Sequence, residues 1–182
     1  MGFFGLFGRR SQDRAGFGLY GNVVAAARDP YLYERLGVPD TLDGRFDVVG
    51  LHAFLLIRRL RALPDPGPEL AQAVFDAMFS DMDVNLREMG VSDLSVGKRV
   101  KAMWEAFHGR AQAYEAALSV NDRAALATAI ARNVWRGGGG PSGAAMLLAR
   151  VAVAQDGHLA TQTLDRFAAG HVDFLPAAVA AR

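Results

Sequence analysis

The 182-residue chain lacks several features that would place it in a well-known functional class. It contains no cysteine, which excludes disulfides, thiolate metal sites and cysteine nucleophiles. Its longest apolar run, VVGLHAFLLI, is interrupted by Gly50 and His52 and falls far short of the roughly 18–20 residues that cross a membrane. A net charge of +1 argues against broad, non-specific binding to nucleic acid. The composition, 51% apolar and 21% charged, is that of an ordinary globular domain.

Catalytic and metal-binding motifs are missing as well. The sequence has no HExxH and no GxSxG, and its four histidines show no i,i+4 pairing. We expect His52 to be a hydrogen-bonded core residue and His108 to lie on the polar side of its helix. RGGGGPSG lacks the Lys-Ser/Thr of a phosphate loop and is predicted to be a flexible connector. We therefore predict a protein that is not an enzyme, without catalytic residues, metal, cofactor or small-molecule substrate, and with no DNA partner.

The first residues, MGFFGLFGRR, are apolar first and basic second, the reverse of a secretory signal. This order predicts a cytoplasmic protein. Residues 1–14 are predicted to be a flexible Gly/Phe/Arg tail. Its apolar side chains are candidates for contact with a membrane surface, although a disordered tail explains the composition equally well: Phe3, Phe4, Leu6 and Phe7.

Helical periodicity dominates the rest of the chain and predicts an all-α, single-domain bundle of about seven helices over residues 15–175, followed by a loose tail, 176–182. The segment 44–63 is apolar almost all round and is expected to be central to the bundle. Helices are expected at about 16–28, 30–36, 44–63, 68–89, 96–118, 122–135, 142–155 and 159–169.

The stretch FSDMDVNLREMGVSD carries two aspartates close together beside a narrow apolar stripe. On one helix, Asp81 and Asp83 lie roughly 200° apart, so they flank the stripe on opposite sides and cannot chelate one ion together. An ordinary solvated surface, a partner-binding surface and a metal site all remain open. The stripe itself is core or open groove: Phe75, Phe79, Met82, Leu86 and Met89, ending at Gly90.

An alternative function uses the same helix. Its four acidic residues could hold Mg²⁺ in an all-α enzyme, or in a protein that binds an isoprenoid or quinone-like ligand: Asp76, Asp81, Asp83 and Glu88. This alternative requires facing carboxylates on a second helix, and no matching acidic run is found.

Two basic clusters differ in their position on the helices. Arg58, Arg59 and Arg61 close an apolar helix, where cations favour the carboxyl end of the dipole. A second cluster, Lys98, Arg99 and Lys101, lies at the start of a helix, where the helix dipole disfavours cations. This position points to contact with an acidic partner, phospholipid head groups or ribosomal RNA.

Two segments in order, YLYERLGVPDTLDGRFDVVGLHAFLLIRRLRA and VFDAMFSDMDVNLREMGVSDLSVGKRVKAMWEAFHGRAQAYEAAL, resemble the ubiquinol–cytochrome c chaperone family. The resemblance covers roughly residues 31–135. It implies an assembly chaperone that binds newly made or immature cytochrome b during biogenesis of the cytochrome bc1 complex.

The resemblance also implies that the protein binds its client at the cytoplasmic face of the inner membrane. A ribosome or the membrane surface is a further candidate partner. The matched positions Phe79, Asp81, Asp83, Leu86 and Met89, together with the basic residues Lys98, Arg99 and Lys101, form the candidate client-binding surface.

Overall fold

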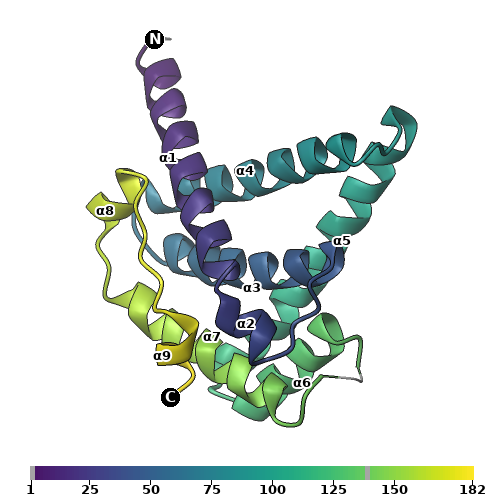
Figure 1. Cartoon of the computed structure of the whole chain (residues 1–182). Coiled ribbons are helices and arrows are strands. Elements are labelled where there is room, and N and C mark those ends of the chain that lie inside the picture. The colour runs from purple at the N-terminus through teal and green to yellow at the C-terminus, as the bar shows by residue number, and fades with distance from the viewer. Residues whose placement is uncertain (1–2, 138–139) are drawn as a thin grey trace.

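A computed structural model describes the backbone of residues 3–137 and 140–182, and the side chains of these residues from Ser11 onward. Within these residues the fold is all helical, as predicted (Figure 1). The helices are α1 (Phe3–Ala27), α2 (Pro30–Glu34), α3 (Leu42–Arg61), α4 (Gly67–Glu88), α5 (Asp93–Ser119), α6 (Arg123–Val134), α7 (Ala144–Ala160), α8 (Leu164–Ala168) and α9 (Ala177–Ala180).

Helix α3 lies at the centre of the molecule, as its all-round apolar pattern predicts. The side chain of Thr41 caps its first turn by accepting a hydrogen bond from the backbone N–H of Gly44, at 3.2 Å. Helices α1, α4, α6 and α7 pack around it (Figure 1). Its buried side chains form much of the core: Phe46, Val48, Leu51, Ala53, Phe54, Leu55, Leu56, Ile57 and Leu60.

Helices α4 and α5 form a long hairpin whose tip lies away from the central helices (Figure 1). The turn between them begins at Gly90, which has a φ of +80° and so ends α4 in the left-handed region that glycine favours, as predicted. Near the tip, Leu86 of α4 and Val96 of α5 are buried, while Leu94 is 91% exposed. The hairpin therefore has a small apolar interior of its own beyond the main core.

Helix α1 crosses α4 at very close range. A Cβ added to Gly16 would lie 2.6 Å from the Cβ of Ala73, so this crossing requires a glycine. The structure corrects the predicted N-terminal boundary, because α1 begins at Phe3 and residues 3–14 belong to a helix. The helix runs without a break through the glycines at positions 5, 8, 16 and 18, although glycine has a low helix propensity.

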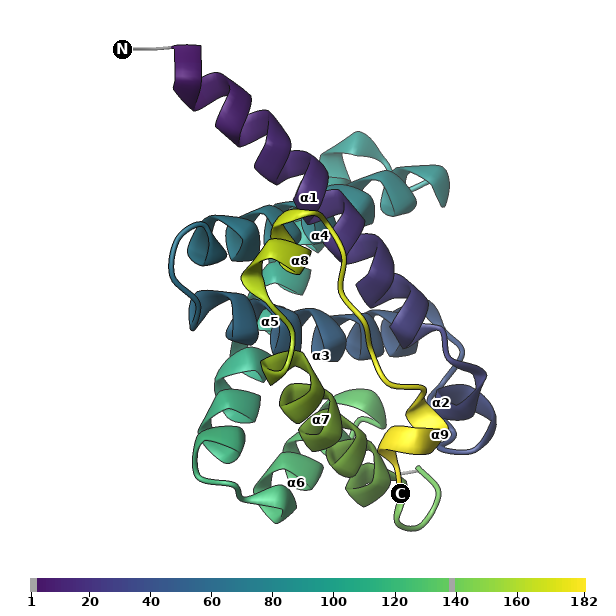
Figure 2. The ribbon, with the colours of Figure 1, turned by 90° about the vertical axis from the view of Figure 1, so that its left-hand side faces the viewer.

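The C-terminal residues were predicted to be a loose tail, and this prediction is wrong. The segment after α8 runs along the surface of the bundle and brings α9 beside α2 and α7 (Figure 2). Ala177, Ala180 and Ala181 are buried, and Arg150 donates to the carbonyl oxygen of Ala181 at 3.1 Å. Small alanine side chains gave no strong apolar signal, yet they allow this close packing.

The Asp29 carboxylate joins the start of α2 to the start of α9, which lies beside it (Figure 2). Its Oδ1 accepts from the N–H of Tyr31 at the start of α2, and its Oδ2 accepts from the N–H of Ala177 at the start of α9, at 2.9 and 2.8 Å. One side chain thus caps two helices, and the second of its partners, Ala177, lies 148 residues from Asp29 in the sequence.

We predict that Asp29→Ala lowers the free energy of unfolding by about 2–3 kcal/mol, because two helix caps are lost together. Asp122→Ala is the matched control, since Asp122 caps only α6 through the N–H of Ala125, and a loss of about 1 kcal/mol is expected there. Urea denaturation followed by circular dichroism measures both values. Equal losses in the two variants would show that the contact with Ala177 contributes nothing.

Candidate functional site

The apolar stripe of α4 is part core and part groove wall. Met82 and Leu86 are buried, whereas Phe75 and Phe79 are half-buried and Met89 is 54% exposed. The sequence left open whether this stripe is core or open surface. Its residues are divided between the two environments along the helix.

The two aspartates of the stretch point to different partners. The hydroxyl of Tyr20 on α1 donates to Asp81 at 2.9 Å, which attaches α4 to α1. Arg87 donates to Asp83 at 2.6 Å, the i,i+4 pair that the sequence predicts, and also pairs with Asp93 at the start of α5. Both carboxylates thus contribute to packing and ion pairing within the hairpin and with α1.

The acidic helix does not form a chelating cluster. Asp76 accepts from Gln72 on the outer face of α4, and no group of three or more potential metal ligands occurs in the part of the chain that the structure describes. The facing acidic helix that a Mg²⁺ site of this kind requires is absent from the described residues.

The basic residues Lys98, Arg99 and Lys101 are exposed on the first half of α5. Lys101 lies 3.8 Å from Glu105, and no ion pair of Lys98 or Arg99 occurs among the described residues. They lie on the α4–α5 hairpin together with the α4 candidates, and their role as a client-binding surface stays a prediction. The side chains of Phe3, Phe4, Leu6 and Phe7 lie outside the described residues.

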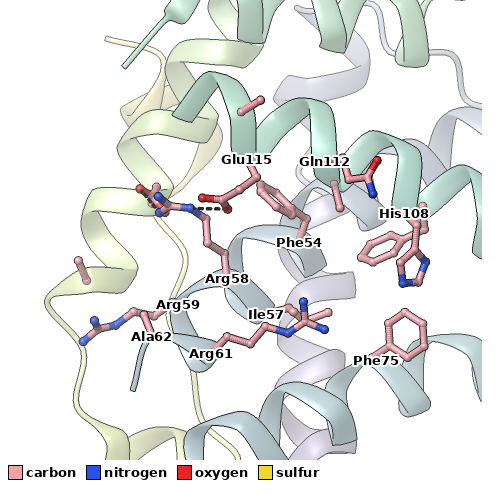
Figure 3. A pocket seen from close by; sticks show the side chains of 15 residues that line it. Phe54, Ile57, Arg58, Arg59, Arg61, Ala62, Phe75, His108, Gln112 and Glu115 are labelled. Carbon is pink, nitrogen blue, oxygen red and sulfur yellow. Dashed lines mark hydrogen bonds and ion pairs between the residues drawn. The ribbon is translucent and has the colours of Figure 1, made fainter. Parts of the chain in front are cut away.

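A groove of about 920 Å³ lies between the carboxyl half of α3 and the middle of α5, with α4 and α7 at its ends (Figure 3). We call it the α3–α5 groove. It is lined by Phe54, Ile57, Arg58, Arg59, Arg61, Ala62, Phe75, Phe107, His108, Ala111, Gln112, Glu115, Ala116, Asp156 and Ala160. Its volume lies at the upper end of the range of about 300–1,000 Å³ for ligand-sized clefts.

One end of the groove is aromatic. The ring of Phe75 lies 5.8 Å from that of Phe107 and 5.6 Å from that of His108, in both cases edge to face. The His108 ring also lies 4.0 Å from that of Trp104, which is 45% exposed, and its Nδ1 bonds to the Trp104 carbonyl. His108 was predicted to lie on the polar side of its helix, but aromatic neighbours surround it. Such clusters bind apolar segments through their large contact area.

The other end of the groove is charged. Arg58 donates to Glu115 of α5 at 2.9 Å and to Asp156 of α7 at 2.7 Å, so it holds three helices together. Arg59 donates to the carbonyl oxygen of Gln162 at 3.3 Å. The sequence attributed these arginines to the helix dipole alone. Their partners lie 57, 98 and 103 residues away, so no local pattern could reveal them.

His52 is buried on α3, and its Nδ1 lies 2.8 Å from the carbonyl oxygen of Val48. Its ring packs edge to face against Phe174, at 5.5 Å between centroids. Burial lowers the pKa of His52, so the neutral ring is favoured. The predicted core histidine is confirmed.

A buried ion cluster fixes the other side of α3 against α5 and α6. The Asp47 carboxylate is fully buried and lies 2.6 Å from Arg110 and 3.2 Å from Arg136. Burial raises the pKa of Asp47 to about 6, although the two arginines act in the opposite direction. No local pattern indicates this cluster, because Asp47 stands immediately before the apolar run VVGLHAFLLI and its partners Arg110 and Arg136 lie on other elements.

This raised pKa predicts a pH-dependent stability. An unfolded aspartate titrates near about 3.9, so the folded carboxyl binds its proton more tightly, and its stabilising contribution is complete only below about pH 4 and falls as the pH rises through 6. We expect the free energy of unfolding of the natural protein, relative to Asp47→Asn, to fall by on the order of 2 kcal/mol between pH 4 and 7. Denaturant titrations of both proteins at several pH values measure the difference. A difference that rises with pH would mean that the arginines outweigh the burial.

Comparison with known proteins gave consistent matches. A family model described as Ubiquinol-cytochrome C chaperone matches residues 34–174. The chain is 26% identical over 102 residues to ubiquinol-cytochrome-c reductase complex assembly factor 1 of Xenopus laevis, covering 56% of this chain and 50% of that protein. It is 33% identical over 110 residues to the mitochondrial protein CBP3 of Saccharomyces cerevisiae, covering 59% and 32%. The chain thus matches half or less of the length of these curated relatives.

A solved structure matches over a larger share of the chain. The crystal structure of the Cbp3 homolog from Brucella abortus is 33% identical to this chain, with a TM-score of 0.83 over 96% of this chain and 97% of that one. The similarity therefore extends over nearly the whole chain, including most of α1 as well as the central helices.

Proposed function

The chain belongs to the ubiquinol-cytochrome C chaperone family, and we propose that it is an assembly chaperone for the cytochrome bc1 complex, ubiquinol–cytochrome c reductase. The observation that carries this proposal is the family match over residues 34–174, which includes every residue lining the α3–α5 groove. The Xenopus laevis relative, ubiquinol-cytochrome-c reductase complex assembly factor 1, supports the same role by its name.

The client we propose is newly made or immature cytochrome b. A client of this kind carries long apolar segments that need cover before assembly, and an aromatic groove can bind one such segment as a helix. The half-buried rings of Phe75 and His108 in the α3–α5 groove support this mode of binding. The role is non-enzymatic, in keeping with the description of the family as a chaperone.

We further propose that the protein works beside a membrane, at the cytoplasmic face of the inner membrane. None of the described helices is long and apolar enough to cross a bilayer. Helix α1 extends from the bundle toward the N-terminus (Figure 1), which places its apolar first residues at the periphery. The exposed Lys98, Arg99 and Lys101 are candidates for contact with a ribosome or an anionic surface.

Deletion of the gene is expected to lower both the assembled bc1 complex and haem-loaded cytochrome b, because unprotected cytochrome b is lost before assembly. Native gels measure the complex, and reduced-minus-oxidised spectra of membranes measure the haem. Expression of the natural chain from a plasmid should restore both, and another respiratory complex, assembled without this client, serves as the control. Normal amounts of complex and haem in the deletion strain would contradict the proposal.

A further inference from the structure

One cation in the α3–α5 groove has no partner in the described part of the protein. Arg58 engages both carboxylates of the groove, Glu115 and Asp156. Arg61 is exposed and forms no ion pair with any described residue. The groove lining holds three arginines and two acidic residues, so its net charge is positive. Arg61 is the exposed arginine among them, and its guanidinium is available to bind an acidic group.

The direction of the three arginines differs. In Figure 3, Arg58 points to Glu115 and Arg59 points away from the aromatic end, whereas the guanidinium of Arg61 points toward the side of Phe75 and His108. The dipole of α3 favours a cation in this last turn, but it does not require the side chain to lie over the groove. Here an unpaired guanidinium adjoins an apolar and aromatic surface.

This combination specifies the chemistry of an occupant. An apolar face can cover the half-buried rings of Phe75 and His108, which lie over the buried Phe107, while a carboxylate can pair with Arg61 through the planar, two-pronged geometry of the guanidinium. The amide of Gln112, also in the lining, adds a hydrogen-bonding group on the α5 side. A single free cation is a poor match to the many phosphates of a nucleic acid.

We propose that the α3–α5 groove binds an apolar helical segment of the client protein that carries an acidic side chain, and that Arg61 pairs with this carboxylate. The proposal rests on the proposed function, since it names the binding site and the client chemistry for that role. It places the main client contact on the α3 side, rather than on the candidate surface of the α4–α5 hairpin.

Binding of synthetic peptides tests the proposal directly. Fluorescent peptides that tile the host's cytochrome b are titrated into the full-length protein and followed by anisotropy. We expect the binding peptides to combine an apolar segment with Asp or Glu, and replacement of that residue by its amide to weaken binding about tenfold, equal to about 1.4 kcal/mol. Arg61→Glu should weaken binding at least as much, and Arg61→Lys should retain only part of it, because Lys keeps the charge but lacks the two-pronged geometry.

A charge swap separates pairing from a general loss of structure. A peptide with Lys at the acidic position should bind Arg61→Glu better than it binds the natural protein. Arg123→Glu, an exposed reversal at the start of α6 outside the groove, is the matched control and should bind as the natural protein does. Unchanged affinity in Arg61→Glu, or loss in Arg99→Glu instead, would overturn the groove assignment in favour of the hairpin.

Cross-linking in cells locates the client. A photoreactive residue at the exposed Ala116, in the groove lining, should cross-link to cytochrome b, and one at the exposed Ala124 of α6 should not. A small molecule that competes for the groove while no peptide binds would also overturn the proposal. A deletion strain that loses the bc1 complex but is fully restored by Arg61→Glu refutes the groove and leaves the assembly role intact. A deletion strain with normal complex refutes the assembly role itself.

Discussion

The burial of α3 on almost every side is the constraint that organises the rest of the molecule. A helix without a polar face is stable only when other helices cover it, and each large apolar side chain that it buries contributes about 1.5–3 kcal/mol. Helices α1, α4, α6 and α7 meet this requirement from different directions. The two ends of α3 differ in what they contact. The first half carries Asp47 of the buried ion cluster, and the last turns form one wall of the groove.

Much of the helical architecture could be predicted because its determinants are local. The apolar pattern of α3, the stripe of α4 and the glycine at its end each depend on residues within one or two turns. The opposite directions of Asp81 and Asp83, and the Asp83–Arg87 pair, follow from helical geometry in the same way. The family was also recognised from two segments in order, and the family model and the solved structure confirm it.

The groove and the terminal segments could not be predicted, because their contacts join distant parts of the chain. Arg58 looked like a helix-dipole residue until Glu115 and Asp156 were placed beside it. His108 looked polar because its aromatic neighbour Phe75 belongs to another helix. The C-terminal alanines looked loosely held because the cap that fixes them, Asp29, lies near the other end of the sequence. Periodicity reports which face of a helix is apolar, but not which helix will cover it.

The residues that line the α3–α5 groove run from Phe54 to Ala160 in the sequence, so they leave the ribosome at very different times. Arg58 reaches its partner Asp156 only after 98 further residues have been made. Until then Glu115 is the one carboxylate of the groove lining that Arg58 can meet. A chain whose synthesis stops before α7 therefore has the aromatic end of the groove but lacks Asp156 and Ala160 at its charged end.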